Sequence, residues 1–275
     1  MGLIQFEQRR ARQPDDTTAL NWESPQANGL VHYWPFNSRA LTELVLGGIN
    51  GVGDAVSVAT PYGLAREFNG SVQVQTTPSY RVINAIAWSC CAFVKFSSFT
   101  NAYNTLICAN GSSAGFRDFH VKSNGKLAPY IKTTGGIGSS AYDGTGANTL
   151  STGVWYHLAF TYSINGGLVG YVNANVDGTG VIDGNADALT GTPYITVGSN
   201  QPAFANRYIN GTVFDARFYD RALSALEIRQ IYREPWQLFA PRRIWVPVSA
   251  ASGAPTLAAI AASNLTASGA RLTVT

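Results

Sequence analysis

Short stretches of alternating apolar and polar residues run along most of the chain. In the clearest one, at residues 153–162, every second side chain is large and apolar: Tyr156, Leu158, Phe160 and Tyr162. A period of two residues is typical of a β-strand that buries one face. The pattern therefore predicts a protein built from short strands.

Comparable stretches predict further strands, and Gly, Asn and Asp residues between them predict turns. The predicted strands lie at 30–36, 64–74 (two strands around an Asn-Gly turn), 87–96, 105–111, 116–122, 127–132, 153–162, 170–173, 193–199 and the first part of 209–224. Glycine-rich segments at 47–53 and 135–149 predict loops.

One short helix is predicted directly after the last of these strands. Ser224 and Glu227 have the spacing of a capping box, in which the serine accepts an early backbone N–H and the glutamate reaches back. Pro235 ends the helix. The residues that this helix can bury are Leu223, Leu226, Ile228, Ile231 and Tyr232.

The two ends of the chain differ from the middle. Residues 1–28 are polar and rich in Arg and Gln, which predicts an extended arm before a domain at 29–234. Residues 235–254 are rich in Pro and aromatic residues, and we expect a linker whose first part, to 247, is neither a helix nor a central strand. The tail at 255–275 predicts two strands between Leu257 and Thr275, which would need a partner because two strands alone are marginal in water.

Composition agrees with an all-β fold. The chain has 275 residues, of which 45% are hydrophobic and only 13% charged, well below the usual quarter. No apolar run reaches the roughly 18 residues of a membrane span, and the N-terminus lacks the apolar segment of a signal peptide. These features predict synthesis in the cytoplasm without membrane insertion.

Charge and cysteine content exclude some partners. The net charge is +3, but the basic residues are scattered apart from Arg9, Arg10 and Arg12 and the pair Arg242 and Arg243. Nucleic-acid binders concentrate basic residues on one face, so we expect no nucleic-acid partner. The three cysteines, Cys90, Cys91 and Cys108, have no metal-binding spacing and are expected to be free and buried.

The stretch from 29 to 232 resembles the laminin-G-like, concanavalin A-type jelly-roll family. The resemblance is carried by the motifs at 29–36, 87–96, 155–162, 171–173 and 210–232. It implies an antiparallel jelly-roll β-sandwich with one short C-terminal helix. One departure is Ala174, where the family commonly has Gly after Asn173; Ala in a left-handed turn costs about 1 kcal/mol unless Asn175 takes that position.

Catalytic and metal-binding patterns are missing from the sequence. The jelly-roll glucanases carry carboxylates as Glu-x-Asp-x-x-Glu on one strand, and no such motif occurs here, so we expect no enzyme. His32, His120 and His157 fall on separate predicted strands and are expected to be structural. No cofactor is predicted. Calcium, which some family members bind through loop oxygens, is left open at Asp118, Asp143 and Asp183, whose spacing gives it no support.

The arm, sandwich and tail together resemble structural proteins of tailed bacteriophages. This resemblance implies a virion structural or decoration protein, made in the host cytoplasm, forming a homo-oligomer and attached to capsid or tail proteins through its ends. Exposed tryptophans are costly without a partner, although arm and tail could instead fold back on their own sandwich. The candidate partner-binding residues are Arg9, Arg10, Trp22, Trp236, Phe239, Arg242 and Trp245.

The alternative is a carbohydrate-binding adhesion module that recognises glycans on a host surface. Such a site needs aromatic side chains together with Asn or Asp on loops. The candidate glycan-binding residues are Tyr142, Asp143, Asn200 and Phe204. The two functions are compatible in one protein.

Overall fold

The fold is known from a computed structural model, which describes the greater part of the chain. The described residues are 13–14, 17–38, 44–45, 52–53, 55–72, 74–75, 86–110, 116–131, 146–180, 194–200, 207–239, 244–248 and 256–260.

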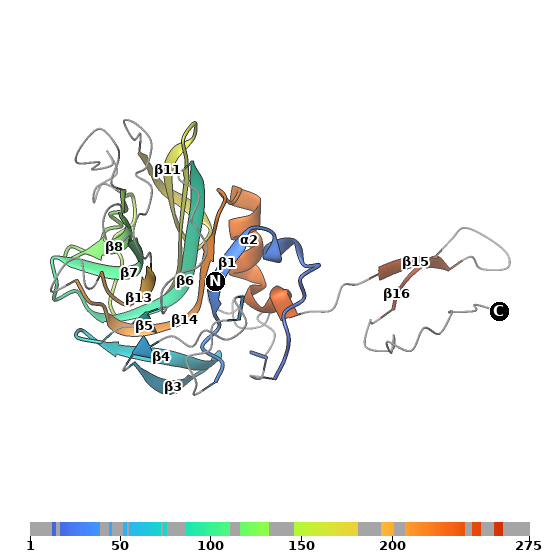
Figure 1. Cartoon of the computed structure of the whole chain (residues 1–275), viewed down its shortest axis with the longest axis horizontal. Coiled ribbons are helices and arrows are strands. Elements are labelled where there is room, and N and C mark those ends of the chain that lie inside the picture. The colour runs from blue at the N-terminus through green and yellow to red at the C-terminus, as the bar shows by residue number, and fades with distance from the viewer. Residues whose placement is uncertain are drawn as a thin grey trace.

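Two antiparallel sheets form a β-sandwich, as the sequence predicted (Figure 1). The eight-stranded sheet has the order β12-β11-β10-β6-β14-β4-β3, and β1 also pairs with β14. Its strands are β1 (Leu30–Trp34), β3 (Val56–Thr60), β4 (Gly63–Asn69), β6 (Ala87–Ser98), β10 (Trp155–Ser163), β11 (Gly167–Val172), β12 (Asn175–Gly180) and β14 (Asn210–Tyr219).

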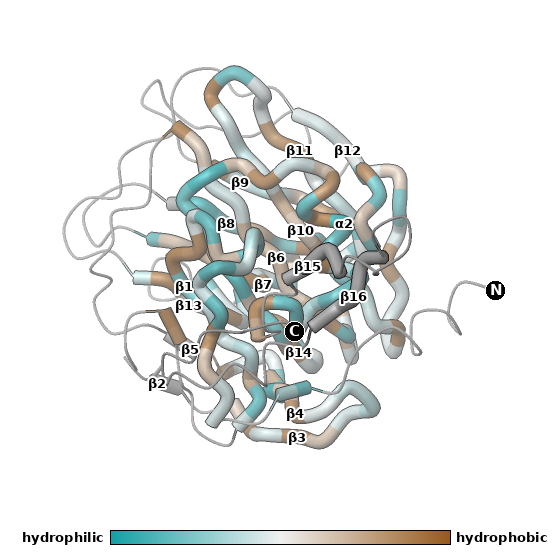
Figure 2. The backbone as a smooth tube through the Cα atoms, turned by 90° about the vertical axis from the view of Figure 1, so that its right-hand side faces the viewer, coloured by the Kyte–Doolittle hydropathy of each residue, from teal (hydrophilic) through white to brown (hydrophobic). Residues whose placement is uncertain are grey.

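The six-stranded sheet has the order β2-β5-β13-β7-β8-β9. Its strands are β2 (Val52–Gly53), β5 (Val74–Gln75), β7 (Tyr103–Asn110), β8 (Phe116–Lys122), β9 (Tyr130–Ile131) and β13 (Tyr194–Val197). Figure 2 shows polar and apolar positions interspersed along the strands of both sheets, as expected where one face is buried.

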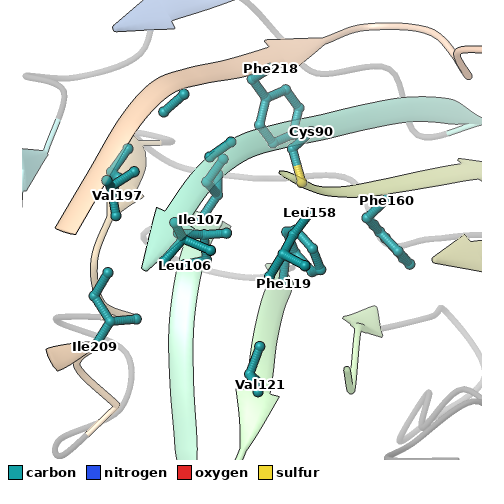
Figure 3. Close-up of a cluster of buried hydrophobic side chains, with 14 of the residues drawn as sticks. Cys90, Leu106, Ile107, Phe119, Val121, Leu158, Phe160, Val197, Ile209 and Phe218 are labelled. Atoms are coloured by element: carbon teal, nitrogen blue, oxygen red, sulfur yellow. The ribbon is translucent and has the colours of Figure 1, made fainter. Parts of the chain in front are cut away.

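The main core lies between the two sheets. Phe119 on β8 stacks on Phe160 of β10 at 5.7 Å between ring centroids, and Trp88 on β6 lies 5.0 Å from the same ring. Figure 3 shows how side chains from both sheets meet in this layer, with the buried thiol of Cys90 among them. The three cysteines are free and buried, as predicted.

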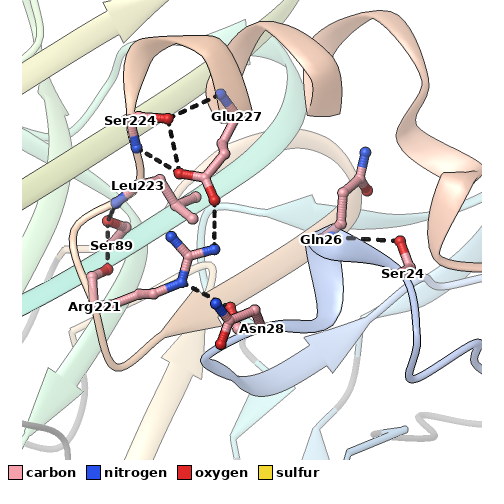
Figure 4. Close-up of polar contacts among 8 residues, drawn as sticks. All are labelled: Ser24, Gln26, Asn28, Ser89, Arg221, Leu223, Ser224 and Glu227. Atoms are coloured by element: carbon pink, nitrogen blue, oxygen red, sulfur yellow. Dashed lines mark hydrogen bonds and ion pairs between the residues drawn. The ribbon is translucent and has the colours of Figure 1, made fainter.

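Helix α2 (Ala225–Arg233) begins with the predicted capping box (Figure 4). The Ser224 hydroxyl accepts the Glu227 N–H, and the Glu227 carboxylate accepts the Ser224 N–H at 2.8 Å. Arg221 links this cap to the N-terminal region: its guanidinium donates to Glu227 at 2.6 Å and to the carbonyl of Asn28 at 2.8 Å.

Three short elements cover the outer face of the eight-stranded sheet. They are α2 and the 3-10 helices η1 (Pro25–Ala27) and η2 (Pro235–Phe239), which bury a second apolar cluster with Tyr33, Cys91 and Tyr219. The Asn21 N–H donates to the Leu238 carbonyl at 2.7 Å, so the two ends of the domain contact each other directly.

A buried ion pair lies beneath these elements. Arg217 on β14 donates to Asp215 at 2.9 Å and to Gln26 of η1 at 2.7 Å, and it also donates to the carbonyl of Pro235 in η2. Asp215 sits at a β-bulge with a φ of 56°. This costly backbone conformation aims its carboxylate at the arginine that ties both termini to the sheet.

The prediction for residues 235–247 is wrong in its first part, because 235–239 form η2 and pack onto the sandwich. Further on, β15 (Ile244–Val248) pairs with β16 (Thr256–Ile260) as a separate two-stranded sheet. The first strand of this hairpin therefore lies inside the predicted linker. Residues 261–275, where the second predicted tail strand falls, lie outside the described residues.

Three strands were not predicted. Strand β2 lies inside the glycine-rich 47–53 segment that was predicted to be a loop, β3 follows this segment, and β12 follows the Asn173–Ala174 turn. Asn173 and Ala174 both have positive φ, at 50° and 66°, so Ala174 itself takes the left-handed position and Asn175 does not. Residues 175–180 then read Asn-Val-Asp-Gly-Thr-Gly, a composition typical of turns, which conceals the strand.

Candidate functional site

The outer face of the six-stranded sheet carries a cluster of polar side chains. Phe119 and Val121 on β8 point into the core, so Asp118 and His120 project from the opposite face. Asp118 pairs across the sheet with Tyr130 on β9, which therefore lies on the same face. Asp118 is fully buried and His120 is 2% exposed, although both lie on the outer side of the sandwich.

Hydrogen bonds join Asp118 to residues from three other segments. Asn200, directly after β13, donates to the Asp118 carboxylate at 2.6 Å and accepts from Asn110 of β7 at 2.9 Å. Arg207 donates to Asp118 at 3.1 Å. The imidazole Nδ1 of His120 lies 3.4 Å from the other carboxylate oxygen. We call Asn110, Asp118, His120, Asn200 and Arg207 the Asp118 cluster.

Two tyrosines border the cluster and remain partly exposed. The ring of Tyr103 lies 4.7 Å from that of His120 in an edge-to-face arrangement, and the Arg207 guanidinium stands 4.4 Å above the Tyr103 ring. Tyr130 borders Asp118 from the neighbouring strand. Arg207, with 20% of its side chain exposed, is the member of the cluster that both touches Asp118 and reaches solvent.

The partners of Asp118 keep its carboxylate ionised. Burial alone would raise the pKa of Asp118, but the charge and hydrogen bond of His120, the charge of Arg207 and the Asn200 amide outweigh burial, and the pKa is lowered. The nearby thiol of Cys108 has a raised pKa because of burial and because of the Asp118 charge. Within the cluster, the buried Asp118 carboxylate is therefore ion-paired with the partly exposed Arg207 guanidinium.

Of the four predicted glycan-binding residues, the structure describes Asn200. It is fully buried and acts inside the Asp118 cluster, so the expectation that it is exposed on a loop is wrong. Tyr142, Asp143 and Phe204 lie outside the described residues. Phe204 belongs to a segment that starts after Asn200 and ends before Arg207, two members of the cluster.

Sequence reasoning did not select Tyr103, Arg207 or His120 for this cluster. His120 was expected to be a structural residue on a strand, and Asp118 appeared only as an oxygen ligand for calcium. The signal available in the sequence is the alternation at 118–121, where the polar residues Asp118 and His120 alternate with the apolar residues Phe119 and Val121. The contribution of Arg207 is a long-range contact that no local pattern reveals.

The predicted partner-binding residues fall into four groups. Trp22 is 55% exposed, and its contact with a partner stays a prediction. Trp236 is only 5% exposed and stacks on Phe214, so it belongs to the core of its own chain and its predicted exposure is wrong. Phe239 is partly buried and packs beside Trp236. Trp245 lies in β15. Arg9, Arg10 and Arg242 lie outside the described residues.

Histidines and acidic residues are side chains of this chain that could bind a metal ion. His32, His120 and His157 lie on β1, β8 and β10, and all three are buried. Within the described segments, no group of three or more His, Cys, Asp or Glu side chains is arranged to hold a metal ion. Of the residues considered for calcium, Asp143 and Asp183 lie outside these segments. None of the described helices is long and apolar enough to cross a membrane.

A family model matches more than half of the chain. The model, described as the concanavalin A-like lectin/glucanases superfamily, covers residues 68–229. This range includes most strands of both sheets, the Asp118 cluster and the first part of α2, whereas β1, β2, β3 and most of β4 precede it. A comparison with curated protein sequences finds no match.

Solved structures with the same fold include parts of carbohydrate-active enzymes and a toxin. Domain 4 of AbnA, an extracellular arabinanase of Geobacillus stearothermophilus in complex with arabinotriose, has a TM-score of 0.59 and 17% identity, with 74% of this chain and 98% of that chain covered. A mutant Trypanosoma rangeli sialidase with trans-sialidase activity has a TM-score of 0.55 and 15% sequence identity, with 82% of this chain and 37% of the sialidase covered. The binding domain of botulinum neurotoxin serotype G has a TM-score of 0.54 and 12% sequence identity, with 74% of this chain and 50% of that chain covered. At these identities the likeness establishes the fold alone.

Proposed function

This chain belongs to the concanavalin A-like lectin/glucanase superfamily, and on that basis we propose that it is a non-catalytic carbohydrate-binding protein whose saccharide site is the Asp118 cluster with its bordering tyrosines. The observation that carries the proposal is the arrangement of Asp118, Arg207 and Tyr130 on one outer face of the sandwich.

The chemistry of this face suits a sugar. Saccharides present hydroxyl groups, which bond to planar polar side chains, and apolar C–H faces, which pack on aromatic rings. Arg207 can donate to a ligand oxygen while Asp118 fixes its orientation, and this orientation is set before binding. Tyr130 supplies an aromatic surface beside it. Because Asp118 and Arg207 compensate each other in charge, the expected ligand is a neutral saccharide.

The contacts of Asp118, Asp215 and Glu227 support a binding role over hydrolysis. Glycoside hydrolysis needs a second carboxyl group roughly 5–10 Å from the first, across the scissile bond. Asp118 is engaged by Asn200, Arg207 and His120, and Glu227 is engaged in the helix cap. Asp215 is sealed with Arg217 on the other sheet. The absence of hydrolytic activity is part of the proposal, and reducing-sugar release from a polysaccharide panel tests it.

Similar proteins add support of a general kind. The arabinanase domain is named in complex with arabinotriose, and the Trypanosoma rangeli enzyme in complex with sialic acid. These ligands belong to those proteins. For this chain they motivate a glycan screen that contains both neutral pentose and hexose oligosaccharides and acidic sugars.

A glycan array followed by calorimetry with the strongest ligand tests the proposal. Replacing Tyr130 by Ala removes the aromatic surface, and Arg207→Gln removes the charged donor; each is expected to weaken binding by roughly tenfold or more. Arg221→Gln is the matched control, because Arg221 is also partly exposed and ion-paired with a carboxylate, Glu227, but on the other side of the sandwich. The proposal would be overturned if the protein bound no glycan on the array, or if the affinity for its ligand were the same in Tyr130→Ala, Arg207→Gln and the wild-type protein.

A second role, attachment to a virion as a structural or decoration protein, is favoured by one specific observation. The hairpin β15–β16 pairs with no other described strand, and two isolated strands are marginal in water. A terminal hairpin that needs additional pairing suits a protein held on a larger assembly by strand addition. Many attached copies would make weak glycan contacts strong through multivalency.

Particle composition tests this second role. Phage particles purified from a producing culture and analysed by quantitative mass spectrometry are expected to contain the chain at a fixed multiple of a capsid or tail protein. Cross-linking in intact particles is expected to join residues 240–275 to a virion protein. Particles that lack the chain would contradict the virion role and leave the glycan proposal unaffected.

A further inference from the structure

The two edges of the eight-stranded sheet are protected to very different degrees. At one edge, β12 is covered by its own chain: the Asp177 carbonyl accepts the Ala147 N–H at 2.9 Å, and its carboxylate accepts the Asn148 N–H at 2.7 Å. This strand also carries a charge, two glycines and a bulge in its pairing with β11. Such features prevent another strand from adding to an edge.

The other edge, β3, has main-chain groups that point outward. In the ladder between β3 and β4, Ala59 pairs with Leu64. The N–H and C=O of Leu64 bind the side chain of Gln13, on the side away from β3. Ala59 and Leu64 therefore form a non-hydrogen-bonded pair, and the N–H and C=O of Ala59 point away from β4. By the alternation of the ladder, those of Ser57 do the same.

Strand β3 also lacks the usual protection of an edge. Its sequence, Val-Ser-Val-Ala-Thr, contains no charge and no proline, and its pairing with β4 runs without a bulge. Val56 is 63% exposed. Among the described residues no strand pairs with its outer side. An uncharged, regular edge with outward donors and acceptors is a template for one more strand.

The hairpin β15–β16 supplies a strand of matching length and chemistry. β16 has five residues, as β3 does, and its sequence Thr-Leu-Ala-Ala-Ile contains neither charge nor proline. β15 contains Pro247, which lacks an N–H and disfavours pairing on its outer side. The open edge of β16 is therefore the one suited to strand addition. In Figure 1 the hairpin lies apart from β3 of the same chain.

From these two unsatisfied edges we propose that β16 of one copy adds to β3 of a second copy, which extends the eight-stranded sheet and links copies head to tail. The contact is heterologous, so it closes into a ring or continues as a chain according to its rotation. The inference rests on the attachment role proposed above, which it deepens by naming the acceptor strand, and it makes no use of the Asp118 cluster.

Paired substitutions at the two edges test the acceptor strand in the full-length protein. Val56→Lys places a charge on the β3 edge, and Val176→Lys places the same charge on β12, where the valine is similarly exposed. Sedimentation velocity over a concentration series is expected to show self-association of the wild-type and Val176→Lys chains, weakened roughly tenfold or more by Val56→Lys. Near-unchanged circular dichroism and unfolding midpoint would establish that each variant is folded.

A mixing experiment tests the donor strand. Ala258→Pro interrupts β16 without touching the sandwich. Val56→Lys retains an intact donor, and Ala258→Pro retains an intact acceptor. At a concentration where the wild-type chain associates but its association, weakened tenfold, would be lost, each variant alone is expected to sediment as a monomer, whereas an equimolar mixture is expected to form a 1:1 dimer that cannot extend.

The other outcomes overturn the inference. A wild-type chain that stays monomeric at all concentrations would exclude pairing between copies, while the particle experiment would still decide the virion role separately. Self-association of Ala258→Pro alone would show that β16 is not the donor, for example because two β3 strands pair with each other. Equal weakening by Val56→Lys and Val176→Lys would show that β3 is not the acceptor.

Discussion

The outer faces of the two sheets each hold an aspartate paired with an arginine, and they differ in what covers the pair. Asp215 and Arg217 on the eight-stranded sheet are 2.9 Å apart and both fully buried beneath η1 and η2. Asp118 and Arg207 on the six-stranded sheet are 3.1 Å apart, and the arginine is 20% exposed. The same type of ion pair thus occurs twice. We call Asp215–Arg217, which other elements of the chain bury completely, the sealed pair, and Asp118–Arg207, whose arginine reaches solvent, the open pair.

The difference separates a structural ion pair from a candidate binding site. Burial would lower the pKa of Arg217, but the Asp215 charge outweighs this effect and raises it, so the guanidinium stays charged in a dry environment. Every direction around it is filled by the sheet or by terminal segments. Arg207 has one side in the cluster and one side in water, so a ligand can reach it without unfolding anything.

The largest expected effect comes from breaking the sealed pair. Arg217→Met leaves Asp215 buried without its counter-ion and removes the link to Gln26 and Pro235, so the free energy of unfolding should fall by about 3–5 kcal/mol. Urea unfolding followed by tryptophan fluorescence measures this loss. Arg207→Met, the same change in the open pair, should cost about 1 kcal/mol in stability. Equal losses of unfolding free energy in the two variants would mean that Arg207 is as important for stability as Arg217, and the distinction between a structural pair and a binding-site pair would fail.

The next effect concerns how firmly the C-terminal end of the domain covers its sheet. Trp236→Ala removes a ring buried against Phe214 and should destabilise the fold by about 3 kcal/mol. Trp22→Ala removes a ring that is 55% exposed and should change stability by no more than about 0.5 kcal/mol. Thermal unfolding of both variants checks the contrast. A tolerant Trp236 would indicate that η2 is not part of the folded domain.

These two tryptophans also show where sequence reasoning reached its limit. Both lie in segments without strand periodicity, and the sequence alone offered each of them as a partner contact or, alternatively, as a residue folded back on the sandwich. The strands and the capped helix follow from local rules, namely a period of two and the spacing of Ser224 and Glu227. The burial of Trp236 depends on Arg217 and Pro235, whose contact has no local signature.

The candidate site could not be predicted from the sequence for the same reason, because its residues have no local pattern in common. Asp118 is 82 residues from Asn200 and 89 from Arg207, so its cluster exists only after the sheet has formed. The family resemblance gave the sandwich correctly, but it carried no site with it, because one fold holds many different functions. Strand β12 was missed because its composition is that of a turn, and its pairing with β11 overrides that preference.

An intermediate effect is expected from the open pair itself. Asp118→Asn removes the charge that holds Arg207 and should lower stability by about 1–3 kcal/mol at neutral pH and abolish glycan binding. The lowered pKa of Asp118 fixes the sign of the pH dependence: the carboxylate stabilises the fold above its unfolded pKa near 3.8, and this contribution is lost as the pH falls through the lower folded value. Urea titrations from pH 7 to pH 3 should show the two proteins converging at the acid end. If the difference in unfolding free energy between the two proteins stayed constant with pH, the destabilisation by Asp118→Asn would not come from the loss of the charge.

The smallest expected effect comes from an ion pair that is neither sealed nor part of the site. Glu227→Gln preserves the capping box, since glutamine can accept the Ser224 N–H, but it removes the charge opposite Arg221. Burial would raise the pKa of Glu227, yet bonds from Arg221 and Ser224 lower it to about 2. Stability from the carboxylate is therefore complete above about pH 4.5 and lost toward pH 2. Because both side chains are partly exposed, the loss at pH 7 should be below about 1 kcal/mol, measured by urea unfolding with glycan affinity unchanged. A larger loss, or any change in glycan affinity, would show that the helix cap and the six-stranded face are coupled, and the separation between the two outer faces would then fail.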